Sequence, residues 1–144
     1  MPKLVSINIS PATGTGKKPV AEAVLEIAHG IKGDAHARDW HRQISLLAME
    51  SIREMETRHP DQGLGPGSFA ENLTTEGLDL PRLPIGTRLK IGATVLEITQ
   101  IGKKCHARCQ IHEQAGECIM PRQGIFARVL VGGAIRVGTE ITVI

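Results

Sequence analysis

Aromatic residues are scarce in this 144-residue chain, which contains one tryptophan, two phenylalanines and no tyrosine. Proteins that bind single-stranded nucleic acid stack successive bases on aromatic rings, and Trp40, Phe69 and Phe126 are too few for such a surface. The net charge is only +2, from 17 basic and 15 acidic residues. Because non-specific nucleic-acid binding needs a broad basic surface, we expect no nucleic-acid partner.

Long apolar runs are absent as well. No stretch approaches the roughly 18 apolar residues that could span a bilayer, and the N-terminal sequence MPKLVSINIS lacks the apolar core of a signal peptide. We therefore predict a cytoplasmic protein with no membrane partner. Cytoplasmic thiols are held reduced, so the three clustered cysteines are better interpreted as metal-binding, sulfur-handling or buried thiols than as disulfides.

Short strands broken by glycine dominate the chain. Residues 3–9 alternate with the period of a strand that has one buried face, and residues 88–99 do so on either side of a turn at Gly92. Residues 126–144 repeat the pattern between further glycines. This pattern predicts a set of short strands and hairpins.

One helix is evident from the sequence. Met49, Ile52 and Met55 recur on one helical face, and Pro60 ends the helix. A loop rich in glycine and proline follows, and a second, shorter helix is predicted within residues 107–116. Many strands, one or two helices and no βαβ alternation predict a mainly β fold, a mostly antiparallel barrel or sandwich that forms a single domain over the whole chain.

The segment ATGTGKKPV resembles a phosphate-binding loop only superficially. Such a loop needs a glycine where Pro11 stands and a serine or threonine where Lys18 stands. We therefore interpret Lys17 and Lys18 as a solvated basic turn, with contact to a ligand phosphate as the alternative.

Histidine and aspartate are dense in HGIKGDAHARDWHRQISLLA, which contains His29, Asp34, His36 and His41. These residue types bind divalent metals, but no pair has the i,i+4 spacing of a helical metal site. Gly33 and Asp34 favour a turn in which the aspartate bonds to its own backbone. We prefer the turn to the metal site.

Polar residues also gather in GSFAENLTTEGLDL, near the expected end of a strand. They are Glu71, Asn72, Thr74, Thr75 and Glu76. Such density is typical of capped turns and also of a ring of donors and acceptors around a ligand. Both interpretations stay open at this stage.

The most pointed chemistry surrounds Cys105. Lys103 and Lys104 precede it, and His106 and Arg108 follow. A cationic setting favours the thiolate, which is the form that attacks sulfur or binds metal. The position also follows a predicted strand, where a side chain can meet a ligand.

Zinc or an iron–sulfur cluster is the alternative use of the cysteines. Cys105, Cys109 and Cys118 could bind zinc with His106 or His112 as the fourth ligand. The spacing C-x3-C-x8-C lacks a CxxC pair, which weakens this interpretation. Cys109 and Cys118 are equally compatible with burial as small apolar residues.

The motifs GIKGDAHA, RQISLLAMESI, FAENLTTEGLDL and IGTRLKIGATVLEITQ, with a cysteine after the last strand, occur here in one order. This order resembles that of MOSC domains, named for the C-terminal domain of molybdenum-cofactor sulfurases, and the similarity runs from Val5 to the end. The resemblance implies a β-barrel related to the barrel domain of pyruvate kinase.

The resemblance also implies binding of a molybdenum or tungsten cofactor, a pterin dithiolene that bears phosphate. Cys105 then corresponds to the cysteine that carries sulfur or binds the metal, and His106 would maintain its thiolate. The domain would be an accessory or carrier in cofactor maturation. The residues expected to hold the cofactor are Lys17, Lys18, Asp34, His36, Glu71, Asn72, Thr74, Lys103, Lys104 and Arg108.

Partners follow from the same resemblance. Complete sulfurases carry a pyridoxal-phosphate desulfurase domain, for which 144 residues leave no room. Any sulfur transfer would therefore need a cysteine desulfurase or another enzyme of cofactor biosynthesis, and a recipient enzyme. A barrel edge or the methionine-bearing helix would serve a homodimer. In the remaining interpretation the thiols are inert and the domain is a protein-binding adaptor.

Overall fold

The computed structural model describes residues 1–10, 17–102 and 123–144. Its strands are β1 (Lys3–Ile9), β2 (Lys18–Val20), β3 (Glu22–Glu26), β4 (Gly30–Ile31), β5 (Ile44–Ala48), β6 (Leu73–Glu76), β7 (Arg88–Ile91), β8 (Thr94–Ile101), β9 (Ile125–Val131), β10 (Gly133–Arg136) and β11 (Ile141–Val143). Helix α1 covers Met49–Arg58, and 3-10 turns follow at Pro60–Gln62 and Leu80–Arg82. The expected mainly β fold with one domain is confirmed.

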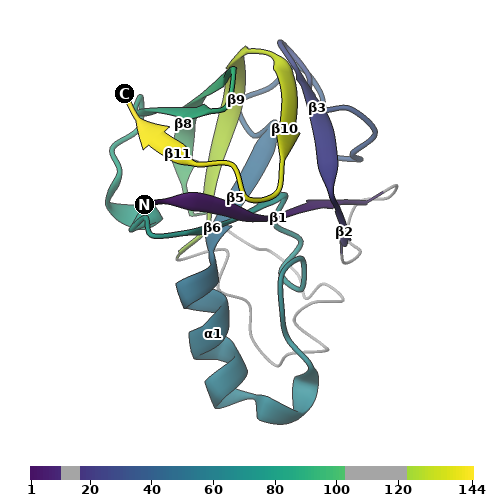
Figure 1. Ribbon diagram of the computed structural model, residues 1–144, viewed down its shortest axis with the longest axis vertical. Helices are drawn as coiled ribbons and strands as arrows, with labels where there is room; N and C mark the ends of the chain where they lie inside the picture. Colours follow the sequence, from purple (N-terminus) through teal and green to yellow (C-terminus); the bar gives the residue numbers. More distant parts are fainter. Residues whose placement is uncertain (11–16, 103–122) are drawn as a thin grey trace.

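Two sheets make up the body of the molecule (Figure 1). The larger has the order β11-β7-β8-β9-β5-β6-β1-β2, in which only the pair β5 and β6 is parallel, and the smaller has the order β10-β3-β4. The expected barrel does not close into a continuous ladder. The segment before β11 reaches β1 through backbone bonds such as that from Leu4 N to Thr139 O at 2.9 Å, and through an isolated bridge between Lys3 and Glu140.

Most elements agree with the sequence pattern. The strand at residues 3–9 and the hairpin of β7 and β8, which turns at Gly92, are confirmed. The helix starts at Met49, because the preceding apolar residues belong to β5, where both faces of the strand are buried. The predicted helix within residues 107–116 lies outside the described residues.

The described residues form two apolar clusters in the interior. The larger lies between the sheets and includes Leu4, Leu96 and Ile98. Helix α1 extends away from the sheets along the long axis of the molecule (Figure 1). It buries Ile52 and Met55 in the smaller cluster, where they meet aromatic residues from outside the helix. No helix in the described ranges is long and apolar enough to cross a membrane.

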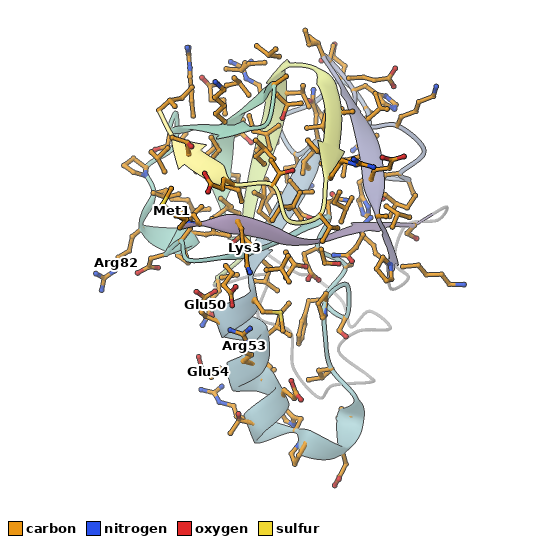
Figure 2. The ribbon with its side chains drawn as sticks, viewed as in Figure 1. Met1, Lys3, Glu50, Arg53, Glu54 and Arg82 are labelled. Atoms are coloured by element: carbon orange, nitrogen blue, oxygen red, sulfur yellow. The ribbon has the colours of Figure 1, made fainter. Side chains whose placement is uncertain are left out.

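Charged residues attach α1 to the larger sheet. Figure 2 shows Lys3 of β1 pointing toward Glu50 and Arg53 near the start of the helix. Arg53 bonds Glu76 of β6 at 3.0 Å, Lys3 lies 3.7 Å from the same carboxylate, and Glu50 accepts the Gly77 amide at 2.9 Å. These exposed contacts fix the base of the helix beside the end of β6.

Candidate functional site

A cavity of about 250 Å³ lies where β5, β9 and the segment before β6 meet. Its lining residues are His36, Trp40, Arg42, Ser45, Phe69, Ala70, Asn72 and Phe126. Every aromatic residue of the chain is among them, although they come from distant parts of the sequence. The cavity therefore combines flat apolar walls with polar groups that can hydrogen-bond, as ligand sites commonly do.

Arg42 is the cation of this cavity. Its guanidinium carbon lies 4.6 Å from the ring centroid of Trp40 and 5.5 Å from that of Phe126, within the range of cation–π attraction. Its Nε is buried and has no hydrogen-bond partner among the described residues. The Nε–H of this guanidinium is a donor of the kind that binds an anionic ligand.

The wall formed by Phe69 and Ala70 is held from behind by Glu71. The buried Glu71 carboxylate accepts hydrogen bonds from the amides of Gly67 and Phe69 and from the hydroxyl of Thr74, at 3.0, 3.3 and 2.7 Å. Burial raises the pKa of Glu71, and these hydrogen bonds only partly offset it. Ala70 has a left-handed φ of 61°, which is unusual for alanine and turns the chain at the cavity wall.

A polar network continues from this wall into the sheet. Asn72 accepts the Ser45 amide at 3.0 Å and donates to the carbonyl of Asn8 at 3.1 Å. Asn8 in turn donates to Thr74 at 3.0 Å and accepts from Ser6 at 2.7 Å. The expectation that β1 buries one face is therefore incomplete, because its polar face is also buried and its groups bond to β6.

The interpretation of Lys17 as part of a solvated basic turn is wrong. Its side chain is fully buried, with Nζ 2.6 Å from Asp34 Oδ1 and 3.1 Å from His36 Nδ1. Asp34 also accepts the amides of Ser10 and His36, at 3.1 and 3.2 Å. Burial alone would raise the pKa of Asp34, but the hydrogen bond and charge of Lys17, with the Ser10 amide, lower it below its usual range.

The bond from the His36 amide to Asp34 is the expected turn in which the aspartate bonds to its own backbone. The structure does not gather the other histidines there, since His41 contacts Gln100 at 2.8 Å and His29 lies 3.9 Å from Glu26. In the described ranges, no group of three or more His, Cys, Asp or Glu residues could hold a metal.

The remaining predicted residues divide into two groups. Lys18 is exposed at the start of β2 and is not among the residues that line the cavity. The residues around the candidate thiol lie outside the described residues. They are Lys103, Lys104, Cys105, His106, Arg108, Cys109 and Cys118.

The ends of the segment that contains Cys105 meet next to the cavity. The amide of Gly102, after β8, donates to the carbonyl of Gly124, before β9, at 2.6 Å. Phe126, which lines the cavity, pairs with Gln100 in the neighbouring strand. The two points at which residues 103–122 join the described structure therefore lie beside the aromatic wall.

Sequence reasoning missed Trp40, Arg42, Ser45, Phe69 and Phe126 as site residues. Trp40 is held by a bond from its indole nitrogen to the carbonyl of His36 at 3.1 Å. The one signal in the sequence was the scarcity of aromatic residues. All three rings line the cavity, and Phe69 and Phe126 also belong to the smaller apolar cluster.

Comparisons with known proteins agree on the fold. The structure is similar to that of the YuaD protein from Bacillus subtilis, with a TM-score of 0.78, 18% identity and coverage of 98% of this chain and 94% of that one. It is also similar to YiiM from Geobacillus stearothermophilus, with a TM-score of 0.77, 22% identity and coverage of 100% and 75%. YiiM from Escherichia coli gives a TM-score of 0.73, 19% identity and coverage of 100% and 70%.

No curated protein sequence matches the chain. The family model of the MOSC domain matches residues 32–142, which include β5, α1 and all the strands from β6 to β10. This match takes in every residue that lines the cavity. The chain therefore belongs to the MOSC domain family.

Proposed function

We propose that this MOSC domain binds the pterin of a molybdenum or tungsten cofactor and handles sulfur or the metal through the thiolate or persulfide of Cys105. It would act as an accessory or carrier in cofactor maturation, with a desulfurase or cofactor-synthesising enzyme as donor and a cofactor-dependent enzyme as recipient. The observation that carries the proposal is the cavity beside the ends of β8 and β9, between which Cys105 stands in the sequence.

The lining of the cavity fits a flat, anionic ligand. The rings of Trp40, Phe69 and Phe126 give the cavity flat aromatic walls, which suit a fused ring. The guanidinium carbon of Arg38 lies 3.7 Å from the Trp40 ring centroid and already covers part of that ring. Arg42 offers a buried Nε–H without a protein partner in the described part of the chain, and such a donor is best satisfied by an anionic or carbonyl oxygen. At about 250 Å³ the cavity suits one ring system of a ligand rather than the whole of a large cofactor.

The other end of the ligand would face residues 103–108. Two residues separate Gly102 from Cys105 in the sequence, and Lys103, Lys104 and Arg108 add cations that would balance a phosphate. When bound, the cofactor supplies a metal already ligated by dithiolene sulfur, for which a soft thiolate is a suitable further ligand. Lys17 does not contribute to phosphate binding in this proposal, because Asp34 already neutralises it.

The test is the metal, pterin and sulfur content of protein purified anaerobically from cells that make the cofactor. We expect molybdenum or tungsten with pterin, or an added sulfur by intact mass, in the wild type. Cys105→Ser should lose them and the matched variant Cys118→Ser should keep them. Zinc in all three proteins without pterin or added sulfur would overturn the proposal in favour of a zinc-stabilised binding domain.

A second pair of variants tests the cavity separately from the thiol. Arg42→Met should lower the pterin content several-fold, because it removes the only cation that lines the cavity among the described residues. Arg82→Met removes a cation that is 87% exposed and remote from the cavity lining, and it should have no effect. Equal pterin content in both variants would exclude this cavity as the binding site.

A further inference from the structure

Two alanines of the described residues have a left-handed backbone. Ala28 and Ala70 each have a φ of 61°, and at the ten other described positions with a positive φ the chain has glycine. A left-handed backbone brings a Cβ atom too close to the following carbonyl oxygen, whereas glycine adopts it freely. Each alanine therefore marks a point at which the fold carries strain that a glycine would not have.

Both strained alanines line a cavity. Ala70 lines the cavity with the aromatic walls, and Ala28 lines a second cavity of about 360 Å³ between the turn after β3 and strand β9. No glycine in the described part of the chain lines either of them. Backbone strain persists only where the surrounding structure enforces it, and it gathers at ligand sites. The methyl groups of these two alanines are therefore candidates for a role at the cavities.

Hydrogen bonds fix the backbone on both sides of Ala70. Its amide donates to the carbonyl of Gly67 at 3.0 Å, and its carbonyl accepts from the hydroxyl of Ser45 at 3.4 Å. The amide of the preceding Phe69 donates to the carboxylate of Glu71, which follows Ala70, at 3.3 Å. Because these partners hold the chain before and after Ala70, the backbone cannot relax out of the left-handed conformation.

The two alanines differ in what their methyl groups contact. Ala70 is partly buried and packs against the smaller apolar cluster, which contains Phe69 and Phe126. These two rings also line the cavity. Ala28 is exposed and belongs to neither apolar cluster. The backbone strain is therefore similar at the two positions, but only the methyl group of Ala70 packs against aromatic rings that line the cavity.

We propose that Ala70 is a ligand-contact residue, and that its methyl group, held in place by the strained backbone, forms part of the wall that a fused ring of the ligand meets. Without the methyl group a gap would separate the wall from the ring, and the ring would lose its dispersion contacts there. The strain and the packing are properties of the protein without ligand. The contact with the ligand rests on the proposed function and adds a residue to its site.

The first measurement is urea unfolding of the complete, ligand-free protein and of Ala28→Gly and Ala70→Gly. Ala28→Gly should raise the urea midpoint, because relief of left-handed strain outweighs the added freedom of the unfolded chain. Ala70→Gly should raise it less, because the packing of the methyl group against the apolar cluster is lost. A midpoint that does not rise in Ala28→Gly would refute the strain, and an equal or larger rise in Ala70→Gly would refute the packing.

The second measurement is a titration of the same proteins with free pterin, followed by the fluorescence of the pterin. Ala70→Gly should bind several-fold more weakly than the wild type, and Ala28→Gly should bind equally well. Ala70→Ser keeps the Cβ atom and should restore most of the affinity. Equal affinity in Ala70→Gly and the wild type would overturn the proposal, and so would binding by Ala70→Ser that is as weak as binding by Ala70→Gly.

These outcomes separate the role of Ala70 from the proposed function. A wild type that binds no pterin, together with the expected differences in urea midpoint, would keep the strain and packing of Ala70 but refute both its ligand contact and the pterin site. Pterin binding that is equal in the wild type and both glycine variants would keep the pterin and refute the ligand contact of Ala70.

Discussion

The two buried carboxylates Asp34 and Glu71 have pKa values that are shifted in opposite directions. Both side chains are buried, and each carboxylate accepts three hydrogen bonds from the protein. The pKa of Asp34 is lowered and that of Glu71 is raised. Burial acts in the same direction on both, so the difference comes from the cation that Asp34 has and Glu71 lacks.

The comparison teaches what each group does for the site. Asp34 and Lys17 form a charge pair that holds the orientation of His36, and its integrity depends on both members. Glu71 is held by amide and hydroxyl dipoles and shapes the loop of Phe69 and Ala70. One region is organised by charge and the other by backbone hydrogen bonds, and they should respond differently to substitution and to pH.

The largest effect should come from Asp34→Asn. The substitution leaves the ammonium of Lys17 buried without a counter-charge, and breaking a buried pair typically costs about 3–5 kcal/mol. Urea unfolding measures this loss. Lys3→Ala removes an exposed lysine 3.7 Å from its carboxylate partner and serves as the control, with a far smaller loss. Equal losses in the two variants would show that the burial of the Lys17 pair has no energetic consequence.

Gly67 connects the two regions, and Gly67→Ala should be nearly as severe. Its φ is +87°, and an added Cβ would lie 2.6 Å from the carbonyl oxygen of Lys17. Left-handed strain and a backbone clash together should cost about 2–4 kcal/mol. Gly65→Ala is the matched control, because nothing lies within 4 Å of its added Cβ. If Gly65→Ala were the more destabilising of the two, the predicted close approach at Gly67 would be wrong.

Glu71→Gln should have a smaller effect, a loss of about 1–3 kcal/mol at acidic pH, because the new amide group must face a donor. The variant should also loosen the cavity wall, since the amides of Gly67 and Phe69 share this carboxylate. Hydrogen exchange at these two amides, compared with amides of β8, measures that loosening. Uniform exchange changes across the molecule would argue against a local role.

The pH dependence of the two variants sharpens the comparison further. The pKa of Asp34 in the folded protein is below its ordinary 3.8. The stability that its carboxylate contributes is therefore complete above pH 3.8 and is lost as the pH falls through the folded pKa. The pKa of Glu71 in the folded protein is above its ordinary 4.5. The stability that its carboxyl group contributes is therefore complete below pH 4.5 and is lost as the pH rises through the folded pKa.

The free-energy difference between wild type and Asp34→Asn should therefore shrink on acidification, and that between wild type and Glu71→Gln should shrink toward neutral pH. Urea unfolding at several pH values over the range in which all three proteins fold measures both. Two differences that move in the same direction would contradict the role assigned to Lys17.

The smallest effect should come from Arg53→Ala on the exposed face of α1. The Arg53 guanidinium lowers the pKa of Glu76, but both groups are in contact with solvent and their attraction is screened. The loss of stability should be below that of every buried variant and should vanish in high salt. A salt-independent loss would mean that Arg53 supports the helix through packing of its stem rather than through its charge.

Local patterns predicted much of the fold. The strand at residues 3–9, the Gly92 turn and the helical face of Ile52 and Met55 depend on neighbours in the sequence, and the structure confirms each of them. The sequence could not show that Lys17 is buried, because its partner Asp34 is 17 positions away and both types are usually exposed. Nor could it show that Ser6 and Asn8 face inward, since their partners lie on β6.

Local sequence patterns were sufficient to predict the positions of the main strands and of α1, the turn at Asp34 and the order of motifs typical of a MOSC domain. The folded chain was needed to show that three scattered aromatic rings and Arg42 line one cavity, and that the Lys17 ammonium contacts the Nδ1 atom of His36. The difference follows from how far apart in the sequence the interacting residues are. Periods and turns follow from contacts between near neighbours, whereas the site depends on pairings between strands that are distant in the chain.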